Sequence, residues 1–492
     1  MLNMFGPGSY VLTAIFAPII GAVVVFIVGA LSGKEKLVAW LSVAIAAVSL
    51  LACLRLIPYV IHGGKVTLEY PLSPVIGFSF TVLVDPLSVV FAVTISLVSF
   101  LSLVYAVGYM EHADMVYAFY AHTLLFIAGM VGTVFASNLL LFYVFWELMC
   151  IPPVFMIFYW GETLEARRIA LKFFVFTHVG ALSILLGILG LYTMYGTFEL
   201  LEMAKNTSIL LANKTLAYVT FALLFVGFGV KMATFPLHNW LPDAHAEAPT
   251  PISCMLSGVM IKCGAYALAR FAITLFKGVY PAFSTAFTII AVITMVYGGL
   301  MAMAQTDIKR LLAFSSISQI GYIFFGLAIG TWLAVVAAVF HVINHALFKA
   351  MLFMCAGAVR HQTGTRDLTV LRGLAKRMPI TALVFTIGGL AIAGTPPFNG
   401  FVSEFLLFTS GIKAGVYIPT LIAILTTIIT AAYYLWVLLR AFFKETPANL
   451  AKVKEVTPVM YVPMFILAVL CVIIGVYPAP VVNLLAKVPG IV

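Results

Sequence analysis

Residues 216–251 read LAYVTFALLFVGFGVKMATFPLHNWLPDAHAEAPTP. This stretch begins as an apolar run long enough to enter a bilayer, carries Lys231 within that run, and is then interrupted by Pro236 and further prolines. Proline removes a backbone donor and clashes with the preceding helical turn. In lipid, such a break survives only where protein or a water-filled cavity surrounds it. The stretch therefore predicts a membrane helix that is broken inside the protein, close to a buried lysine.

The composition places the rest of the chain in lipid as well. Of its 492 residues, 63% are hydrophobic and only 9% are charged, whereas soluble domains carry about 25% charged residues. The mean hydropathy is +1.14. A bilayer-spanning helix needs roughly 20 apolar residues, and fourteen such stretches occur at about 10–31, 37–60, 78–109, 116–134, 137–159, 168–195, 216–238, 249–277, 283–303, 309–329, 333–358, 379–411, 416–443 and 458–485. They predict an all-α polytopic membrane protein in which residues 1–492 form a single integral membrane domain.

A second broken segment lies at a comparable place in the chain. Residues 379–411 are too long for a simple span and contain the sequence GTPPFNG at 394–400. Each break, in helices 7 and 12, falls in the fourth helix of a set of five, and because five is odd the two sets run in opposite senses. Paired interrupted helices indicate an inverted repeat around a central ion path; two unrelated proline kinks are the alternative. The expected parts are helices 1–3 (1–115), a first repeat of helices 4–8 (116–277), a second of helices 9–13 (283–443) and helix 14 (458–485).

The formal charge of +10 follows the membrane topology. If the N-terminus is outside, the inner loops hold Lys34, Lys36, Arg167, Arg168, Lys309, Arg310, Arg360, Arg366, Arg372, Lys376, Arg377, Arg440, Lys444, Lys452 and Lys454. The outer side holds only Lys65, Lys205, Lys214, Lys277, Lys413 and Lys487. Fifteen against six is a positive-inside asymmetry. It predicts a multi-pass protein of the cell membrane with both termini on the outer face, not a nucleic-acid-binding protein. Residues 10–31, without a basic start or a cleavage site, are expected to remain as a helix.

The cysteines argue against a redox centre in this chain. Six are present, at Cys53, Cys150, Cys254, Cys263, Cys355 and Cys471, with no C-x-x-C pair. Iron–sulfur clusters and zinc sites need grouped ligands. We therefore expect small buried thiols and no cofactor bound by this chain.

A short set of ionisable side chains lies inside the predicted spans, where a charge costs at least about 2.5–3.5 kcal/mol on insertion scales. The set comprises Asp85, Glu147, Lys231, Lys262, His341, His345, Lys349 and Glu404, with Lys172, His178, His238 and Arg270 nearer the ends. Side chains that only pack do not need such a charge, so function is the first interpretation. We expect an ion relay with Asp85, His178 and His238 as accessory candidates; for Asp85 a place at the membrane interface is the alternative. Arg55 and Arg270 are expected as snorkelling anchors.

Glu147 and Lys231 are the expected start of the relay. If they approach within 4 Å, their attraction is about 4 kcal/mol at an effective dielectric of 20. A lysine balanced between that attraction and the cost of burial gains or loses its proton when its partner moves. A static ion pair that only fixes the packing of the helices is the alternative.

Lys262, in the middle of its helix, has no acid nearby in sequence and is expected to be the central proton carrier. His341, His345 and Lys349 follow one another at four-residue spacing, so they form one stripe on a helix. The stripe predicts a hydrated proton path; a metal or haem held by the two histidines, or histidines bonded to backbone or water, are the alternatives. Glu404 follows the second break and suits a terminal proton-release carboxylate or a helix cap.

Four motifs resemble the antiporter-like subunits of respiratory complex I. They are FPLHNWLPDAH at 235–245 with Ala248-Pro249, DIKRLLAFSS at 307–316 with Gln319 and Gly321, HALFK at 345–349, and PPFNGF at 396–401 with Glu404. The same family includes subunits of membrane-bound hydrogenases, archaeal sulfur-reducing complexes and Mrp-type Na⁺/H⁺ antiporters. The resemblance covers nearly the whole chain.

The resemblance implies a role for each buried group. It matches Glu147 to the family's helix-5 glutamate, Lys231 to its helix-7 lysine and Lys262 to its central helix-8 lysine. It matches His345 to a bridging histidine and Glu404 to the helix-12 ionisable residue. Many members carry lysine at that last position, so the glutamate, together with a chain that ends soon after helix 14, favours the M-type subunit.

Three functions remain open at this stage. The first is a proton-translocating subunit of a redox-driven translocase, with iron–sulfur clusters or other redox centres in a peripheral partner module and with other antiporter-like and small membrane subunits as neighbours. The second is a subunit of an Mrp-type Na⁺/H⁺ antiporter, and the third is a membrane scaffold whose buried charges serve assembly alone. A self-sufficient solute carrier is disfavoured, because no polar substrate pocket is recognisable.

Overall fold

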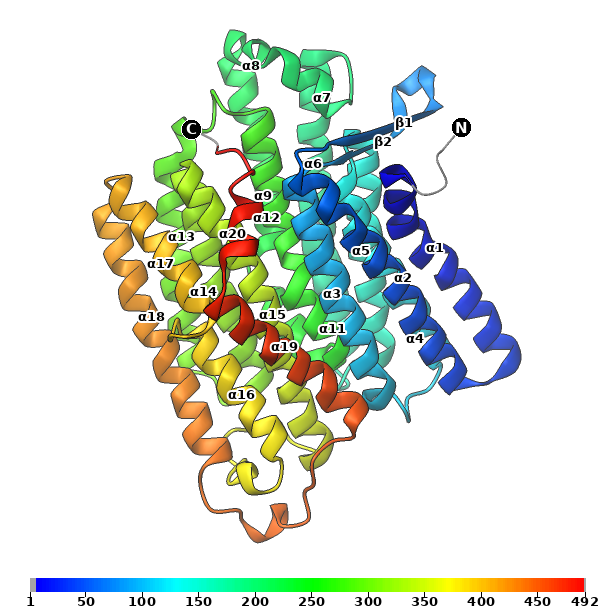
Figure 1. Cartoon of the computed structure of the whole chain (residues 1–492), viewed down its shortest axis with the longest axis vertical. Coiled ribbons are helices and arrows are strands. Elements are labelled where there is room, and N and C mark those ends of the chain that lie inside the picture. Colours follow the sequence, from blue (N-terminus) through cyan, green and yellow to red (C-terminus); the bar gives the residue numbers. More distant parts are fainter. Residues whose placement is uncertain (1–5, 491–492) are drawn as a thin grey trace.

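The structure, a computed structural model, describes residues 6–490 and is almost entirely helical (Figure 1). The long helices are α1 (Pro7–Ser32), α2 (Glu35–Ile61), α3 (Pro86–Tyr109), α4 (Val116–Phe135), α5 (Leu139–Trp160), α6 (Ala166–Tyr195), α9 (Lys214–Met232), α12 (Ile261–Thr274), α13 (Pro281–Met303), α14 (Ile308–Ile329), α15 (Trp332–Thr363), α16 (Pro379–Ile392), α17 (Asn399–Lys413), α18 (Tyr417–Val437) and α19 (Pro458–Val476). Shorter helices are α7 (Leu200–Met203), α8 (Ser208–Ala212), α10 (Leu241–Glu247), α11 (Thr250–Met255) and α20 (Ala479–Leu485).

The predicted membrane fold is confirmed. Thirteen helices in the described part of the chain are long and apolar enough to cross a membrane; one of them joins α11 to α12 through a π-helical turn. The predicted segment 379–411 accounts for the remaining one of the fourteen, because it is divided into α16 and α17, neither of which reaches the length of a span. The protein is therefore an all-α polytopic membrane protein.

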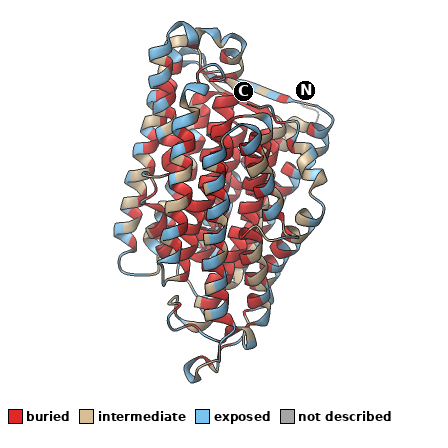
Figure 2. Ribbon diagram, turned by 90° about the vertical axis from the view of Figure 1, so that its left-hand side faces the viewer, coloured by how far each residue is buried: buried red, intermediate tan, exposed pale blue. Residues whose placement is uncertain are grey.

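The helices differ sharply in how deeply they lie. The most apolar stretches of Thr250–Thr274, α14 and α15 are buried along their whole length, whereas less than half of the corresponding stretch is buried in α1, α6, α18 and α19. Figure 2 shows buried residues running through the interior of the bundle and exposed ones on its outer helices. The predicted relay lysines and histidines lie largely on the innermost helices.

The first break follows the expectation from Pro236. Helix α9 ends at Met232, and Ala233 takes a left-handed conformation with φ of 58°. The chain then turns until α10 begins, and the indole N–H of Trp240 donates to the Val230 carbonyl at 2.9 Å. A carbonyl at the broken helix end, which lacks its usual helical partner, is thus satisfied inside the protein. The predicted broken helix 7 is confirmed.

The second break separates α16 from α17. Helix α16 ends at Ile392 and α17 begins at Asn399. The Asn399 amide donates to Asn344 Oδ1 of α15 at 2.9 Å, and the Asn344 amide donates back to the Asn399 carbonyl at 2.9 Å. This reciprocal pair fastens the start of α17 to the buried helix α15. The predicted break in helix 12 is confirmed as well.

Two boundaries predicted from hydropathy are wrong. Residues 78–84 were expected to begin the third membrane helix, but they form strand β2 (Phe78–Val84), which pairs antiparallel with β1 (Val66–Ser73). Aromatic and β-branched residues favour strands, and α3 begins only at Pro86, with Asp85 as its N-cap in a capping box with Ser88. The hairpin lies at the same end of the molecule as α7 and α8 (Figure 1). The last predicted span, 458–485, is likewise divided into α19 and α20.

Candidate functional site

Lys231 lies at the end of α9 and is 1% exposed. Its Nζ donates to the Sγ of Cys150 on α5 at 2.8 Å, and it also lies 5.3 Å from the centroid of the Trp146 ring. A lysine ammonium is attracted to the face of an indole ring. The ammonium of Lys231 therefore has two partners, the thiol of Cys150 and the indole ring of Trp146.

Glu147 contacts α6 rather than Lys231. Its Oε1 accepts a hydrogen bond from the Tyr143 hydroxyl at 3.1 Å and lies 3.1 Å from His178 Nδ1. Among residues 6–490, no Glu147–Lys231 contact comes within the 4 Å considered from the sequence, and the contacts of Glu147 are to Tyr143 and His178. The direct ion pair is therefore not formed in this structure, because Cys150, one helical turn beyond Glu147, takes the lysine. His178 belongs to the site as the partner of Glu147.

Lys262 follows a π-helical turn at Leu256–Met260 that joins α11 to α12. Its Nζ donates to the Ser257 carbonyl within that turn. π-helical turns recur at functional sites, because they disturb the regular hydrogen bonds of a helix. The Ser257 hydroxyl in turn lies 2.7 Å from the Ser316 hydroxyl of α14. The buried lysine is thus connected to the neighbouring helix through two hydroxyl-bearing residues.

The α15 stripe contains two histidines with different surroundings. His341 Nδ1 lies 2.9 Å from Ser403 Oγ of α17, and its Nε2 lies 2.7 Å from Gln319 Oε1 of α14. His345 is fully buried, and neither of its ring nitrogens has a hydrogen-bond partner among the described residues. The two imidazole rings are 6.3 Å apart and nearly parallel. Because protein groups occupy both nitrogens of His341, the arrangement does not favour a metal or haem ligand at this residue.

Lys349 completes the stripe and links it to Lys262. Its Nζ donates to the Leu312 carbonyl at 2.8 Å and to the Tyr434 hydroxyl at 3.0 Å. The Ser316 hydroxyl donates to the same Leu312 carbonyl at 2.8 Å. The contacts from Lys262 through Ser257 and Ser316 therefore reach the carbonyl that holds Lys349. The structure brings these two lysines, 87 positions apart in the sequence, into one polar system.

Glu404 on α17 is 3% exposed. Its carboxylate accepts from the Thr427 hydroxyl at 3.4 Å, and that hydroxyl lies 3.1 Å from the Tyr322 hydroxyl. A cavity of about 390 Å³ adjoins the carboxylate, and its lining includes Phe405 and Ile428, which are exposed on the outside of the bundle. Glu404 thus lies beside a cavity lined by the break after α16, by α17 and by α18. Among the described residues, its side-chain hydrogen bond is to Thr427 and not to a lysine of the polar system.

Arg270 and Asp85 form a buried ion pair. Arg270 Nη1 lies 2.5 Å from Asp85 Oδ2 and Nη2 lies 2.7 Å from Oδ1, a bidentate contact between the end of α12 and the start of α3. Burial by itself raises the pKa of the Asp85 carboxyl, but the charge of Arg270 and the hydrogen bonds from Arg270 and Ser88 together hold this pKa below its usual 3.8. The expectation that Arg270 snorkels is wrong, because a carboxylate within the protein takes its charge. Arg55 is exposed, as a snorkelling residue should be.

Two further sequence candidates lie outside the contacts that join Lys262 to Lys349, and among the described residues no hydrogen bond or ion pair brings Lys231 or Glu404 into those contacts either. His238 is buried between the rings of Phe235 and Tyr297, and neither of its nitrogens has a partner among the described residues. Lys172 pairs with Asp243 of α10 at 2.7 Å. Neither residue contacts the lysines that the polar system joins.

Glu162 is a second charged centre, which the sequence did not single out. It is 3% exposed in its side chain and pairs with Lys309 at 2.5 Å and with Arg360 and Arg366 at 2.7 Å. From the sequence, these three cations were expected only as charges of the inner loops. The cluster joins the turn after α5 to the start of α14, the end of α15 and the segment that follows α15.

The sequence also missed the neutral partners of the charged groups. Cys150, Gln319, Ser403 and Tyr434 each bond to a predicted relay residue. Two of them carried a signal: Cys150 lies three residues after Glu147 and therefore on the same side of α5, and Gln319 accompanies the motif at 307–316. The others come from helices distant in sequence, and no spacing rule could connect them.

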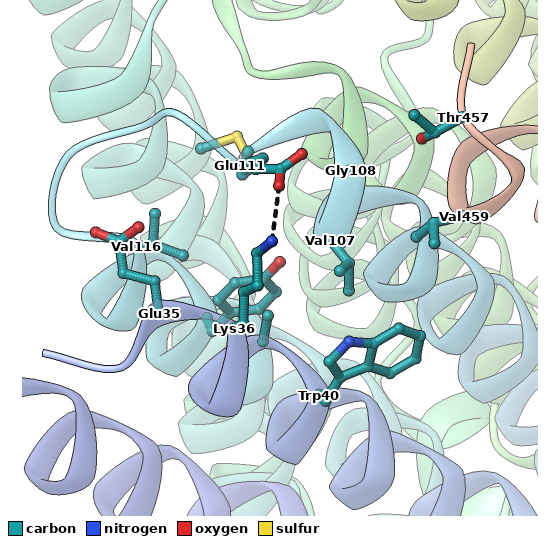
Figure 3. Close-up of a pocket in the computed structure, with 12 residues that line it drawn as sticks. Glu35, Lys36, Trp40, Val107, Gly108, Glu111, Val116, Thr457 and Val459 are labelled. Carbon is teal, nitrogen blue, oxygen red and sulfur yellow. Dashed lines mark ion pairs between the residues drawn. The ribbon is translucent and has the colours of Figure 1, made fainter. Parts of the chain in front are cut away.

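A pocket near the ends of α2 and α3 is not part of this system (Figure 3). It has a volume of about 270 Å³ and is lined by Trp40, Val107 and Thr457, among others, with a Lys36–Glu111 ion pair of 3.2 Å across it. Lys36 is largely exposed. None of the predicted relay residues lines this pocket.

Comparisons with known proteins give curated relatives that are similar in sequence. The chain is 35% identical over 458 residues to a probable K⁺/H⁺ antiporter subunit of Rhizobium meliloti, covering 91% of this chain and 45% of that protein. It is 36% identical to an Na⁺/H⁺ antiporter subunit of Alkalihalophilus pseudofirmus, covering 85% of this chain and 55% of that protein. The chain thus spans about half the length of the curated relatives it matches.

Solved structures agree with the fold. A chain of the archaeal membrane-bound sulfane sulfur reductase superimposes with a TM-score of 0.88 at 30% identity, covering 96% of this chain and 77% of that one. A chain of respiratory complex I from Thermus thermophilus gives 0.85 at 28% identity, covering 97% and 99%. A chain of the Mrp complex from Dietzia gives 0.88 at 23% identity, covering 98% and 96%, which supports the fold alone.

Two family descriptions match the sequence directly. "NADH-Ubiquinone oxidoreductase (complex I), chain 5 N-terminus" matches residues 74–120, and "NADH:quinone oxidoreductase/Mrp antiporter, TM" matches residues 136–430, more than half of the chain. The resemblance seen in the sequence motifs is therefore confirmed. The chain belongs to the NADH:quinone oxidoreductase/Mrp antiporter family of antiporter-like membrane proteins.

Proposed function

We propose that this chain moves protons across the membrane as one component of a multisubunit complex. The path uses Glu147, Lys231, Lys262, His345 and Glu404, with His341 and Lys349 on the same stripe as His345. The observation that carries the proposal is the set of contacts from Lys262 through Ser257 and Ser316 to the carbonyl that binds Lys349. Two lysines that are each costly to bury alone share one connected polar system in the core of the bundle.

The groups in this system have the chemistry that a proton path needs. Lysine and imidazole bind and release protons, and a hydroxyl both donates and accepts hydrogen bonds. A carbonyl cannot pass a proton on. The Ser257 carbonyl therefore only binds Lys262, and the Leu312 carbonyl only holds Lys349 and Ser316 beside each other. Internal water carries the proton across both places. His345, which is buried without a protein partner among the described residues, is a second place where water would bond. Shifts in neighbouring charge then move the proton from one group to the next.

The proposed orientation follows the charges at one end of the bundle. Glu162, Lys309, Arg360 and Arg366 lie in the turns and helix ends that the positive-inside rule places in the cytoplasm. Both termini would then be on the outer face of the cell membrane. A cysteine introduced in the hairpin near Val75, which is exposed, should react with an impermeant thiol reagent added outside intact cells; reaction only after lysis would reverse the orientation.

The relay is tested by Lys231→Ala and Glu147→Gln in the assembled complex. Each change should lower ion movement across membrane vesicles at least tenfold while the content of every protein component stays constant. Lys205→Ala, at an exposed position outside the polar system, is the matched control and should keep full activity. If either relay variant moved ions at the normal rate, the buried charges would serve assembly alone.

Two energy sources are open, and both have support. The relatives named as Na⁺/H⁺ antiporter subunits favour an Mrp-type exchanger. The matches to complex I and to the sulfane sulfur reductase favour a redox-driven pump, whose iron–sulfur clusters or other redox centres would belong to a peripheral partner module. Identifying the chains that purify with this one separates them: iron–sulfur or nickel proteins indicate a redox pump. Their absence, together with Na⁺-dependent proton movement, indicates exchange.

A further inference from the structure

Lys231 of α9 contacts a neutral thiol on α5, although the carboxylate of Glu147 lies one helical turn from that thiol on α5. Cys150 is 2% exposed, and its Sγ is 2.8 Å from Lys231 Nζ. Glu147, three residues earlier on α5, is turned to Tyr143 and His178 instead. Thiol and carboxylate are thus alternative acceptors, and in this structure the lysine uses the weaker one.

The distance between the two acceptors is within reach of a lysine side chain. Residues three apart on a helix have Cβ atoms about 5–6 Å apart, and the lysine ammonium is carried on a flexible stem of four carbons. A rotation of the Lys231 side chain can therefore exchange Cys150 for Glu147 without moving either helix. The exchange also requires Glu147 to release His178, whose side chain is 40% exposed.

We propose that Cys150 is the resting partner of Lys231: it is a positioning residue that holds the ammonium one turn away from Glu147 between transport steps. This inference rests on the proposed function and deepens it. A bond from an ammonium to a carboxylate is roughly twice as strong as a neutral hydrogen bond, whereas a thiol is a weak acceptor. Cys150 therefore keeps Lys231 in place without trapping it. Without Cys150, Lys231 would move to Glu147 and form a static pair.

The inference separates the acceptor function of Cys150 from its volume. Cys150→Ser keeps an acceptor at the position, Cys150→Ala removes it, and Cys150→Val removes it while restoring bulk should the alanine variant assemble poorly. Cys53→Ala is the matched control, because Cys53 is also a buried thiol with a polar partner, Ser96 at 3.2 Å, but contacts no relay residue. All four are compared in the full complex in native membranes, with the content of each protein component measured in parallel.

Cys150→Ala and Cys150→Val should lower ion movement by about three- to tenfold. Cys150→Ser should restore at least half of the normal rate, and Cys53→Ala should leave it unchanged. A high-resolution map of the complex that carries Cys150→Ala or Cys150→Val should show Lys231 Nζ within 4 Å of a Glu147 oxygen. A purely structural role for the thiol would not produce that displacement.

Three results would overturn the inference, and each is distinct from failure of the proposed function. Normal ion movement in Cys150→Val together with an inactive Lys231→Ala would overturn the role of Cys150 and leave the proposed relay intact. A serine variant no better than alanine would show that the thiol acts by its volume. A map of Cys150→Ala or Cys150→Val in which Lys231 stays away from Glu147 would show that Cys150 and Glu147 do not compete for the lysine. If Lys231→Ala were itself fully active, the proposed function would fail first.

Discussion

Arg270 and Asp85 show how a single buried charge depends on one partner. Their side chains are 6% and 13% exposed, and two hydrogen bonds join them. Removing one member of a buried pair leaves the other charge uncompensated, which costs about 3–5 kcal/mol. The pair connects α12, just beyond Lys262, to the start of α3. The ion pair therefore stabilises the contact between α12 and α3.

Arg270→Met should lower the stability of the assembled protein by about 3–5 kcal/mol, because Asp85 would remain buried without its cation. The measurement is the apparent Tm of the purified protein in detergent. Arg55→Met is the control, since Arg55 is exposed and also near a helix end, and it should change the Tm little. Equal Tm values for the two variants would contradict the assignment of Arg270 to a buried pair.

The same pair predicts a response to acid. The pKa of Asp85 is lowered in the folded protein, so the unfolded state takes up the proton first as the pH falls. The contribution of the pair is thus fully present above the usual pKa of 3.8 and is lost as the pH falls through the lower folded value. In Arg270→Met the charge of Arg270 is gone, and burial, opposed only by the hydrogen bonds from Ser88, raises the pKa of the Asp85 carboxyl, so the variant gains stability as the pH falls. The stability difference between the normal protein and Arg270→Met, from thermal unfolding, should therefore shrink between about pH 8 and 5. A difference that stayed constant over that range would contradict a buried Asp85 left without its cation.

The sequence identified charged residues better than it identified their contacts. Lys231, Lys262, Lys349 and Glu404 stood out because a charge in an apolar run is costly, and all four are buried. Their hydroxyl-bearing partners were not visible, because serine, threonine and tyrosine occur at many ordinary positions in the chain. The expected roles of the relay residues stay predictions, since geometry alone does not measure transport.

At the scale of elements, the break between α16 and α17 positions Glu404. Gly394 lies in this break with φ of 65°, and a Cβ built there would meet the Glu404 carboxylate. The absence of a side chain at this position therefore makes room for the carboxylate beside the cavity of about 390 Å³. The break thus determines where the last acidic group of the path lies.

Gly394→Ala should reduce ion movement severalfold, because the new methyl group displaces Glu404. Gly415→Ala is a close control: Gly415 also has a positive φ, of 74°, but nothing lies within 4 Å of its Cβ position. Each variant carries a conformational cost of about 1–2 kcal/mol, so the Tm of both should fall by similar amounts from strain alone. Ion movement is measured in vesicles for both variants. Equal rates for Gly394→Ala and Gly415→Ala would contradict the positioning of Glu404 by the glycine.

Glu162 holds several elements together at one end of the bundle. Three cations surround its buried carboxylate, and they come from the start of α14, the end of α15 and the segment after α15. Glu162→Gln should destabilise the protein by about 3–5 kcal/mol, since the cations would face one another with less compensation. Glu165→Gln, in the same turn but 65% exposed in its side chain, should be nearly neutral in Tm measurements. An unchanged Tm for Glu162→Gln would show that the cluster does not stabilise the packing of these elements.

For the whole molecule, hydropathy predicted the architecture and failed at two boundaries. Apolar length located the membrane helices, and the prolines located both interruptions. The hairpin was missed because FSFTVLV at 78–84 is as apolar as a helix and continues directly towards α3. Hydropathy measures the preference for an apolar environment and does not distinguish a strand from a helix. The two inverted five-helix repeats stay a prediction.

The buried core gives the proposed path its setting. Helices α12, α14 and α15 contribute Lys262, Ser316 and Lys349, and each of these residues is at most 2% exposed. Figure 2 shows buried residues in the interior of the bundle and exposed residues on the outer helices around it. The central claim is that the polar system inside the core moves protons and does not merely join helices.

The most direct test of that claim is ion movement by the assembled complex with Lys262→Met. Methionine keeps an unbranched, flexible side chain but cannot carry a proton, and it removes the bond to the Ser257 carbonyl. The account predicts normal assembly with ion movement across vesicles reduced at least tenfold. An assembled complex that still moved ions at the normal rate without the Lys262 ammonium would contradict it.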